Sequence, residues 1–236
     1  MENLKPEKVL TAKELASYFD HTLLWANATV SEFKKLCDDS KRYGFCMVAI
    51  NPAPVKLCKT FLADSQVHVG AAIAFPLGQT TLEDKLSETR NAIKDGADEI
   101  DYVVNLTKLK AGDTAYIESE MARITDICRE FSVVSKVIFE NCYLTEDEKK
   151  TLCHIAAKVK PDFIKTSTGF GTGGATLEDV ALMKKETEGS GVKIKAAGGI
   201  RTLKTVLEMI DLGVSRIGST SSVAIMEEYM AHSPLL

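Results

Sequence analysis

The sequence has little of what marks a nucleic-acid-binding or membrane protein. It has 29 lysines and arginines against 33 aspartates and glutamates, a net charge of −4, whereas nucleic-acid-binding domains normally carry a basic excess. No apolar run approaches the roughly 18 residues of a membrane span, and residues 1–6 lack the apolar stretch of a secretory signal. These absences predict a cytoplasmic protein with no nucleic-acid and no membrane partner.

The chain also lacks the usual spacing of metal ligands and of disulfide frameworks. Its six cysteines form no Cys-x-x-Cys pair, and no two of its four histidines stand at the helical spacing of metal ligands. A chain of 236 residues with 45% hydrophobic residues needs no cross-links to hold a core. We therefore predict reduced thiols and no metal or other cofactor.

Apolar strand-like runs and amphipathic helix-like runs alternate through the whole sequence. The strand candidates recur about every 28 residues, the length of one strand–helix unit. Eight such units predict a single (β/α)8 TIM barrel over residues 1–236, with an extra N-terminal helix, residues 12–19, that plugs or flanks the barrel bottom. The candidates are residues 20–24, 45–50, 67–74, 99–104, 135–140, 163–166, 192–196 and 216–218.

Local signals support the helices between these strands. Thr29 with Glu32 and Thr145 with Glu148 fit the capping box that begins a helix. The main alternative fold is a doubly wound open sheet, which would usually place a glycine-rich turn after the first strand. Residues 24–28 follow the first strand here and contain no glycine, so the barrel is favoured.

Two lysines end apolar strands and run directly into small residues. Lys165 precedes the Ser/Thr/Gly stretch 166–169, and Lys195 precedes the Ala/Gly stretch 196–199. The active site of such barrels lies at the carboxyl ends of the strands. Burial there lowers a lysine pKa and provides a free amine that can attack a carbonyl. A surface lysine at a strand end is the alternative, and spacing does not decide which amine would be the nucleophile.

One carboxylate lies inside an otherwise apolar strand. Asp101 stands between Ile100 and Tyr102, and strand alternation puts it on the same face as Glu99. A buried carboxylate needs a cation or strong hydrogen bonds, which lysines on neighbouring strands can supply. Both a structural ion pair and a catalytic carboxylate fit this position.

Glycine-rich loops follow the last three strands. They are residues 169–174, 198–199 and 218–221, and the last of them opens a helix. Loops after strands seven and eight, together with a helix N-terminus, commonly bind phosphate in such barrels. We therefore expect a phosphate site, with glycines that serve only as turns as the alternative.

Together these segments resemble the deoxyribose-phosphate aldolase family of class I, Schiff-base-forming aldolases. The resemblance implies a lyase that cleaves 2-deoxy-D-ribose 5-phosphate reversibly to D-glyceraldehyde 3-phosphate and acetaldehyde, in deoxyribose phosphate catabolism. It implies sugar-phosphate and aldehyde partners and metal-independent chemistry, and we expect a homodimer or higher homo-oligomer. The matching segments are residues 20–24, 75–78, 96–101, 136–140, 163–170, 195–202 and 216–219.

The resemblance also implies roles for single residues. Lys165 matches the Schiff-base nucleophile, Lys195 the lysine that perturbs its pKa and joins the proton relay, and Asp101 the proton donor and acceptor. The expected substrate-binding residues are Asp20, Thr22, Cys46, Thr168, Gly169, Gly198, Gly199, Gly218, Ser219, Thr220 and Ser221.

The chain departs from the family pattern in three places. Some members carry a lysine where Phe170 stands, so phosphate binding is expected to rest more on backbone amides here. Thr220 stands where serine is commoner, and residues 233–236 lack the terminal tyrosine of some members. Two alternatives stay open: an aldolase for a different sugar phosphate, and a catalytically silent barrel that senses phosphosugars.

Overall fold

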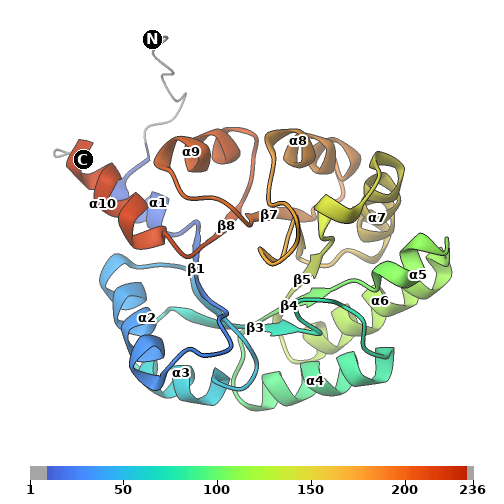
Figure 1. Cartoon of the computed structure of the whole chain (residues 1–236). Coiled ribbons are helices and arrows are strands. Elements are labelled where there is room, and N and C mark those ends of the chain that lie inside the picture. The colour runs from blue at the N-terminus through green and yellow to red at the C-terminus, as the bar shows by residue number, and fades with distance from the viewer. Residues whose placement is uncertain (1–9, 233–236) are drawn as a thin grey trace, which may run out of the picture.

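Eight parallel strands close into a barrel that is surrounded by helices (Figure 1). The computed structural model describes residues 10–232. Each strand pairs with the next, and the last pairs with the first, which confirms the predicted (β/α)8 barrel. The strands are β1 (Phe19–Leu23), β2 (Met47–Ile50), β3 (His68–Ile73), β4 (Glu99–Val103), β5 (Val134–Ile138), β6 (Phe163–Lys165), β7 (Lys193–Ala197) and β8 (Arg216–Ser219).

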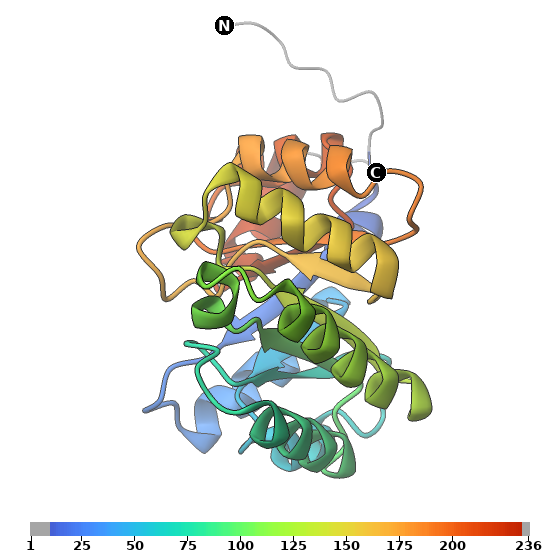
Figure 2. The same ribbon diagram turned by 90° about the vertical axis from the view of Figure 1, so that its right-hand side faces the viewer.

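The helices form a ring outside the strands, and Figure 2 shows α4 to α8 covering the side of the barrel that faces the viewer. No helix among residues 10–232 is long and apolar enough to cross a membrane. The helices are α1 (Ala12–Ala16), α2 (Val30–Tyr43), α3 (Val55–Phe61), α4 (Leu82–Lys94), α5 (Leu106–Lys110), α6 (Thr114–Glu130), α7 (Glu146–Val159), α8 (Leu177–Glu186), α9 (Leu203–Asp211) and α10 (Ser222–His232).

The predicted strands all agree with the observed ones to within two residues, and both predicted capping boxes are present. The Thr29 backbone N–H donates to Glu32 Oε2 at 2.7 Å, and the Thr145 N–H donates to Glu148 Oε2 at 2.8 Å. Each box closes the first turn of its helix, after the loop that leads from the preceding strand. The predictions for residues 1–6 and 233–236 lie outside the described residues.

The N-terminal helix is shorter than predicted and flanks the barrel. α1 ends at Ala16 because the chain enters β1 at Phe19, whereas the prediction extended the helix to residue 19. The helix lies beside α10 at the outer edge of the ring (Figure 1), and the Tyr229 hydroxyl donates to the Leu10 carbonyl. It therefore does not plug the barrel.

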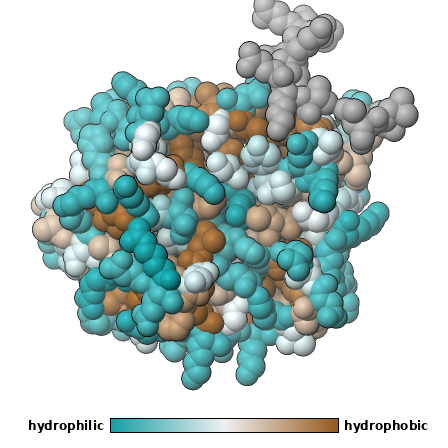
Figure 3. Space-filling model, turned by 180° about the vertical axis from the view of Figure 1, so that it is seen from behind, coloured by the Kyte–Doolittle hydropathy of each residue, from teal (hydrophilic) through white to brown (hydrophobic). Residues whose placement is uncertain are grey.

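The barrel has an apolar layer outside its strands and a charged interior. Ile100 and Tyr102 of β4 point outward and are fully buried under the helices, whereas Glu99 and Asp101 point inward. Strand alternation separates the two sets. The face opposite the view of Figure 1 is mostly hydrophilic, with apolar residues in small areas (Figure 3). The large apolar contacts that hold the fold thus lie between strands and helices.

A fully buried ion pair joins two helices to the end of β4. The Lys85 ammonium of α4 donates to Glu120 Oε1 of α6 at 2.7 Å and to the Val103 carbonyl at 2.8 Å. The second oxygen of Glu120 accepts the Asn105 N–H at 3.0 Å. Burial lowers the pKa of Lys85 and raises that of Glu120, so each group depends on the other to remain charged.

Replacing one member of this pair should cost more than replacing both. Lys85→Met leaves a buried carboxylate without a cation, and we expect the free energy of unfolding to fall by about 3–5 kcal/mol. The double variant Lys85→Met/Glu120→Leu should recover much of that loss, since apolar groups of similar size often substitute for a buried pair. Urea denaturation measures both. A double variant as unstable as the single one would contradict this account.

Candidate active site

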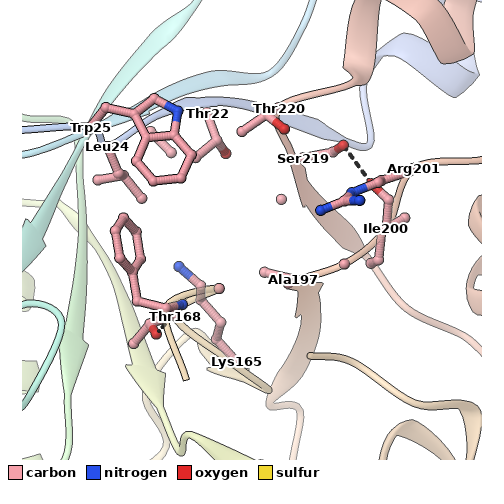
Figure 4. Close-up of a pocket in the computed structure, with 16 residues that line it drawn as sticks. Thr22, Leu24, Trp25, Lys165, Thr168, Ala197, Ile200, Arg201, Ser219 and Thr220 are labelled. Carbon is pink, nitrogen blue, oxygen red and sulfur yellow. Dashed lines mark hydrogen bonds between the residues drawn. The ribbon is translucent and has the colours of Figure 1, made fainter. Parts of the chain in front are cut away.

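A pocket opens at the carboxyl ends of the strands, and most of its lining comes from β1, β6, β7, β8 and the loops that follow them (Figure 4). The Lys165 amine points into it between two unlike sides. Trp25 and Leu24 lie on one side, and Ser219, Ile200 and Arg201 lie on the other. The lining residues are Thr22, Leu24, Trp25, Ala49, Lys165, Thr168, Gly169, Phe170, Ala197, Gly198, Gly199, Ile200, Arg201, Gly218, Ser219 and Thr220.

Lys165 is the last residue of β6 and is only 4% exposed. Burial and the charge of Lys195 together lower the pKa of its amine to about 8, while Asp101 acts in the opposite direction. The amine lies 2.9 Å from Asp101 Oδ2. More of this amine is therefore uncharged at neutral pH than in an ordinary lysine, and the uncharged form can act as a nucleophile.

Three lysines share the carboxylate of Asp101. Lys165 and Lys195 both donate to Oδ2, at 2.9 and 2.6 Å, and Lys136 donates to Oδ1 at 2.7 Å. Burial alone would raise the pKa of Asp101, but the three ammonium groups hold it well below its usual range. The side chain is therefore a carboxylate, and both active-site lysines are held against one of its oxygens.

The same network continues down the barrel interior. Two further carboxylates, Asp20 and Glu99, bind basic side chains there. Asp20 contacts Lys195 at 2.5 Å and Arg216 at 2.7 Å. Glu99 contacts Arg216 at 3.2 Å and also Lys136. Three carboxylates thus face Lys136, Lys165, Lys195 and Arg216, and Glu99 also contacts His68 Nδ1 at 2.7 Å. The basic groups outnumber the carboxylates, and Lys165, with its lowered pKa, is the one that loses its proton most readily.

The wall from β7 and β8 consists of glycines, hydroxyls and one guanidinium. Gly198 and Gly199 have φ of 88° and 75°, a backbone that favours glycine, and they follow β7 directly. The Ser219 hydroxyl donates to the Ile200 carbonyl at 2.7 Å and accepts the Ser221 N–H at 2.9 Å. Arg201 adds a positive charge to this wall, so the wall suits a dianionic phosphate.

The wall from β6 is braced from β5. Glu140 lies just beyond β5 and accepts the Thr168 N–H at 3.1 Å as well as its hydroxyl hydrogen. The Thr168 hydroxyl oxygen in turn accepts the Phe170 N–H at 3.0 Å (Figure 4). This chain of bonds fixes the backbone on both sides of Gly169.

The structure brings eight of the eleven expected substrate-binding residues to the pocket and leaves three away from it. Asp20 lies deeper in the barrel, with its oxygens bound by Lys195 and Arg216. Cys46 precedes β2 at the opposite end of the barrel, and burial raises the pKa of its thiol to about 11. Ala49, further along the same strand, lines the pocket instead. The backbone N–H of Ser221 is turned to Ser219.

The sequence interpretation missed Arg201 and the apolar side of the pocket. Arg201 follows the Gly198-Gly199 pair after one residue, and a basic residue just beyond a glycine-rich turn is the signal that could have found it. Trp25 and Phe170 come from loops after different strands, and no local pattern links them. Among residues 10–232, no group of three His, Cys, Asp or Glu side chains is placed to hold a metal ion.

Comparison with known proteins gives consistent matches over most of the chain. A family model described as DeoC/LacD family aldolase matches residues 14–224. The deoxyribose-phosphate aldolase of Lactobacillus acidophilus is 54% identical over 217 residues, which are 92% of this chain and 91% of the relative. Among solved structures, the aldolase QR15 has 38% identity and a TM-score of 0.88, covering 94% of this chain and 99% of its own. The tetrameric deoxyribose phosphate aldolase of Aeropyrum pernix has 28% identity and a TM-score of 0.88, covering 94% and 93%.

Removing Lys195 should raise the pKa of Lys165. Lys195→Met deletes a repelling cation and leaves Asp101 Oδ2 to Lys165 alone, and both changes favour the ammonium form. We would measure the rate of Lys165 methylation by formaldehyde and cyanoborohydride against pH, using peptide mass spectrometry. The rate should rise with a midpoint near pH 8 in the parent protein and at higher pH in the variant.

Lys193→Met is the matched control for this experiment. Lys193 lies on the same strand but is exposed at its start, with its amine 5.6 Å from the centre of the Phe163 ring. Its removal should leave the midpoint unchanged. A midpoint that is unchanged or lower in Lys195→Met would show that Lys195 does not lower the pKa of Lys165.

Proposed function

The chain belongs to the DeoC/LacD family of aldolases, and from this we propose that it cleaves 2-deoxy-D-ribose 5-phosphate reversibly to D-glyceraldehyde 3-phosphate and acetaldehyde through a Schiff base. The observation that carries the proposal is the buried Lys165 amine, which has a lowered pKa and lies in a pocket with a wall suited to binding phosphate. An amine suits the C1 aldehyde of the open-chain sugar, and the wall of glycines, hydroxyls and Arg201 suits its 5-phosphate.

The first half of the reaction forms the imine. Neutral Lys165 attacks C1, and the resulting carbinolamine loses its hydroxyl as water when it accepts a proton. Lys195 is the nearest proton source, since its ammonium shares Asp101 Oδ2 with Lys165. The product is a protonated imine, and the carboxylate of Asp101 stabilises that positive charge.

The second half breaks the carbon–carbon bond. Asp101 and Lys195, acting through water, remove the proton of the C3 hydroxyl, and relay groups of this type typically contribute about 10²–10⁴ in rate. The C2–C3 electrons move into the iminium and leave an enamine, and D-glyceraldehyde 3-phosphate departs. Protonation of the enamine at C2 and hydrolysis of the imine release acetaldehyde and restore Lys165.

The remaining pocket residues would hold the substrate. We assign the phosphate to the backbone N–H groups around Gly169, Gly198 and Gly199 and to the turn 218–220 ahead of α10. The expectation that phosphate binding rests more on backbone amides needs one addition, because Arg201 lies on the same wall. We assign Thr22 and Thr168, which line the pocket, to the sugar part of the substrate.

The wider biological setting follows from the same proposal. An enzyme with these substrates would act in deoxyribose phosphate catabolism, without a metal or another cofactor, and in the cytoplasm. We also propose a homo-oligomer, since the related enzyme from Aeropyrum pernix is described as a tetramer. Its partners would then be small sugar phosphates, aldehydes and further copies of the chain.

Trapping the imine tests the proposal directly. Incubation with 2-deoxyribose 5-phosphate should release acetaldehyde, and borohydride should fix a two-carbon or five-carbon adduct on Lys165, located by peptide mass mapping. An adduct on Lys195 would reverse the assigned roles. If no sugar phosphate released acetaldehyde and none formed an adduct, the result would favour a silent phosphosugar-binding barrel. An adduct formed only with another sugar phosphate would change the assigned substrate.

Lys165→Leu should abolish cleavage and keep the fold. The expected loss of rate is on the order of 10⁵-fold or more, the scale reported for removal of a covalent nucleophile. The folded pKa of about 8 lies below the ordinary value of 10.5, so the unfolded chain binds more protons between these pH values. Lys165 therefore stabilises the fold least below pH 8, and the variant should unfold in urea at pH 7 no more readily than the parent.

The pH dependence provides the check on that account. The stability of the parent relative to Lys165→Leu should rise between pH 8 and pH 10, because the lysine is neutral in both folded and unfolded states only above that window. Lys193→Leu, which changes an exposed lysine, should show no such trend. If Lys165→Leu unfolded at a much lower urea concentration than the parent at pH 7, Lys165 would be needed for the fold.

A further inference from the structure

Three aromatic rings from three loops meet at the mouth of the pocket. The Phe170 ring, after β6, lies between Trp25, after β1, and Phe75, after β3. The ring centres are 5.5 Å and 5.4 Å apart, and both pairs are edge-to-face. Trp25 is 59% and Phe170 44% exposed, so the two rings contact each other without being buried in the core. Edge-to-face contacts of this kind stabilise the loops that carry the rings.

Phe170 has the one large apolar side chain among residues 170–174, and the backbone at Gly171 and Gly173 packs on Cys142. The other four residues of this stretch are Gly171, Thr172, Gly173 and Gly174, and glycines lose the most conformational freedom when they are ordered. The start of the loop is held by Thr168 on Glu140. Its end is held where the Ala175 N–H donates to the Gly198 carbonyl at 3.1 Å.

The loop lies directly against the wall that we assign to phosphate. Gly174 packs so closely on the Gly198 carbonyl that a Cβ at residue 174 would overlap it. A Cβ at Gly169 would lie 3.7 Å from the Gly198 Cα. The position of the loop therefore fixes how the backbones of Gly169 and Gly198 face the pocket.

We propose that Phe75 and Trp25, by holding the Phe170 ring, position this loop for the substrate phosphate and so favour phosphorylated over unphosphorylated sugars. The inference rests on the proposed function. Phe75 is a positioning residue, because it touches Phe170 but does not line the pocket. Any effect of Phe75 on a substrate must therefore pass through the ring and the loop.

The kinetic test compares two substrates in Phe75→Leu, which keeps an apolar side chain and removes the ring. Loss of one edge-to-face contact should lower kcat/KM for 2-deoxyribose 5-phosphate about tenfold, through KM, with kcat and the unphosphorylated sugar changed less than about twofold. Phe75→Tyr keeps the ring and should restore the parent values. Phe131→Leu, an exposed phenylalanine beyond the far end of α6, is the matched control.

A binding test does not need the aldolase reaction. Trp25 is the single tryptophan of the chain, so its emission reports on the ring cluster. Titration of the parent with inorganic phosphate should shift this emission, and the Kd for phosphate should be about tenfold higher in Phe75→Leu. The thermal melting of each variant, followed by circular dichroism, confirms that it is folded.

The outcomes separate this inference from the proposed function. A parent that cleaves neither sugar would sink the proposed function, and the phosphate titration would then decide the inference alone. Equal losses for both sugars in Phe75→Leu, or an unchanged Kd for phosphate, would overturn the positioning role. A larger loss for the unphosphorylated sugar would mean that the rings bind the sugar chain itself.

Discussion

The site depends on one oxygen atom, Oδ2 of Asp101, which accepts hydrogen bonds from both Lys165 and Lys195. A buried carboxylate is costly to desolvate, and here its surrounding ammonium groups offset that cost. Because the basic side chains of the network outnumber its three carboxylates, one amine is left without a full counter-charge. Burial makes Lys165 that amine, so the network that binds the carboxylate also favours loss of the Lys165 proton.

Barrel closure is what brings these side chains to one level. Asp101 of β4 pairs in register with Lys136 of β5, and Lys165 of β6 pairs in register with Lys195 of β7. Register partners on adjacent parallel strands point to the same face. The inward face therefore collects charges from strands that are far apart in sequence, while the outward face of the same strands packs apolar residues under the helices. The apolar core carries the stability that such a charged interior does not supply.

The sequence predicts the strands, the barrel and the positions of the two lysines because those depend on local periodicity and on which end of a strand a residue occupies. Cys46 illustrates where this fails: it begins an apolar run, so it lies at the amino end of the barrel, and Ala49 at the other end of β2 reaches the pocket. The Lys85–Glu120 pair and the three aromatic rings join segments whose meeting depends on packing. Their partners cannot be read from spacing along the chain.

In the proposed reaction, chemistry and phosphate binding would be coupled, because both would use β6 and β7. Lys165 ends β6 and Gly169 follows it by four residues, and Lys195 of β7 is followed by Gly198 and Gly199 after one short stretch. A phosphate held by these loops would fix the far end of an open-chain sugar at a set distance from the amine. Interactions with the non-reacting phosphate would then be used to orient C1 and C3 at the reacting groups. In this arrangement a small displacement of the glycine loop would weaken binding of the phosphate and so lower kcat/KM, because the loop continues directly from the strand end that carries Lys165.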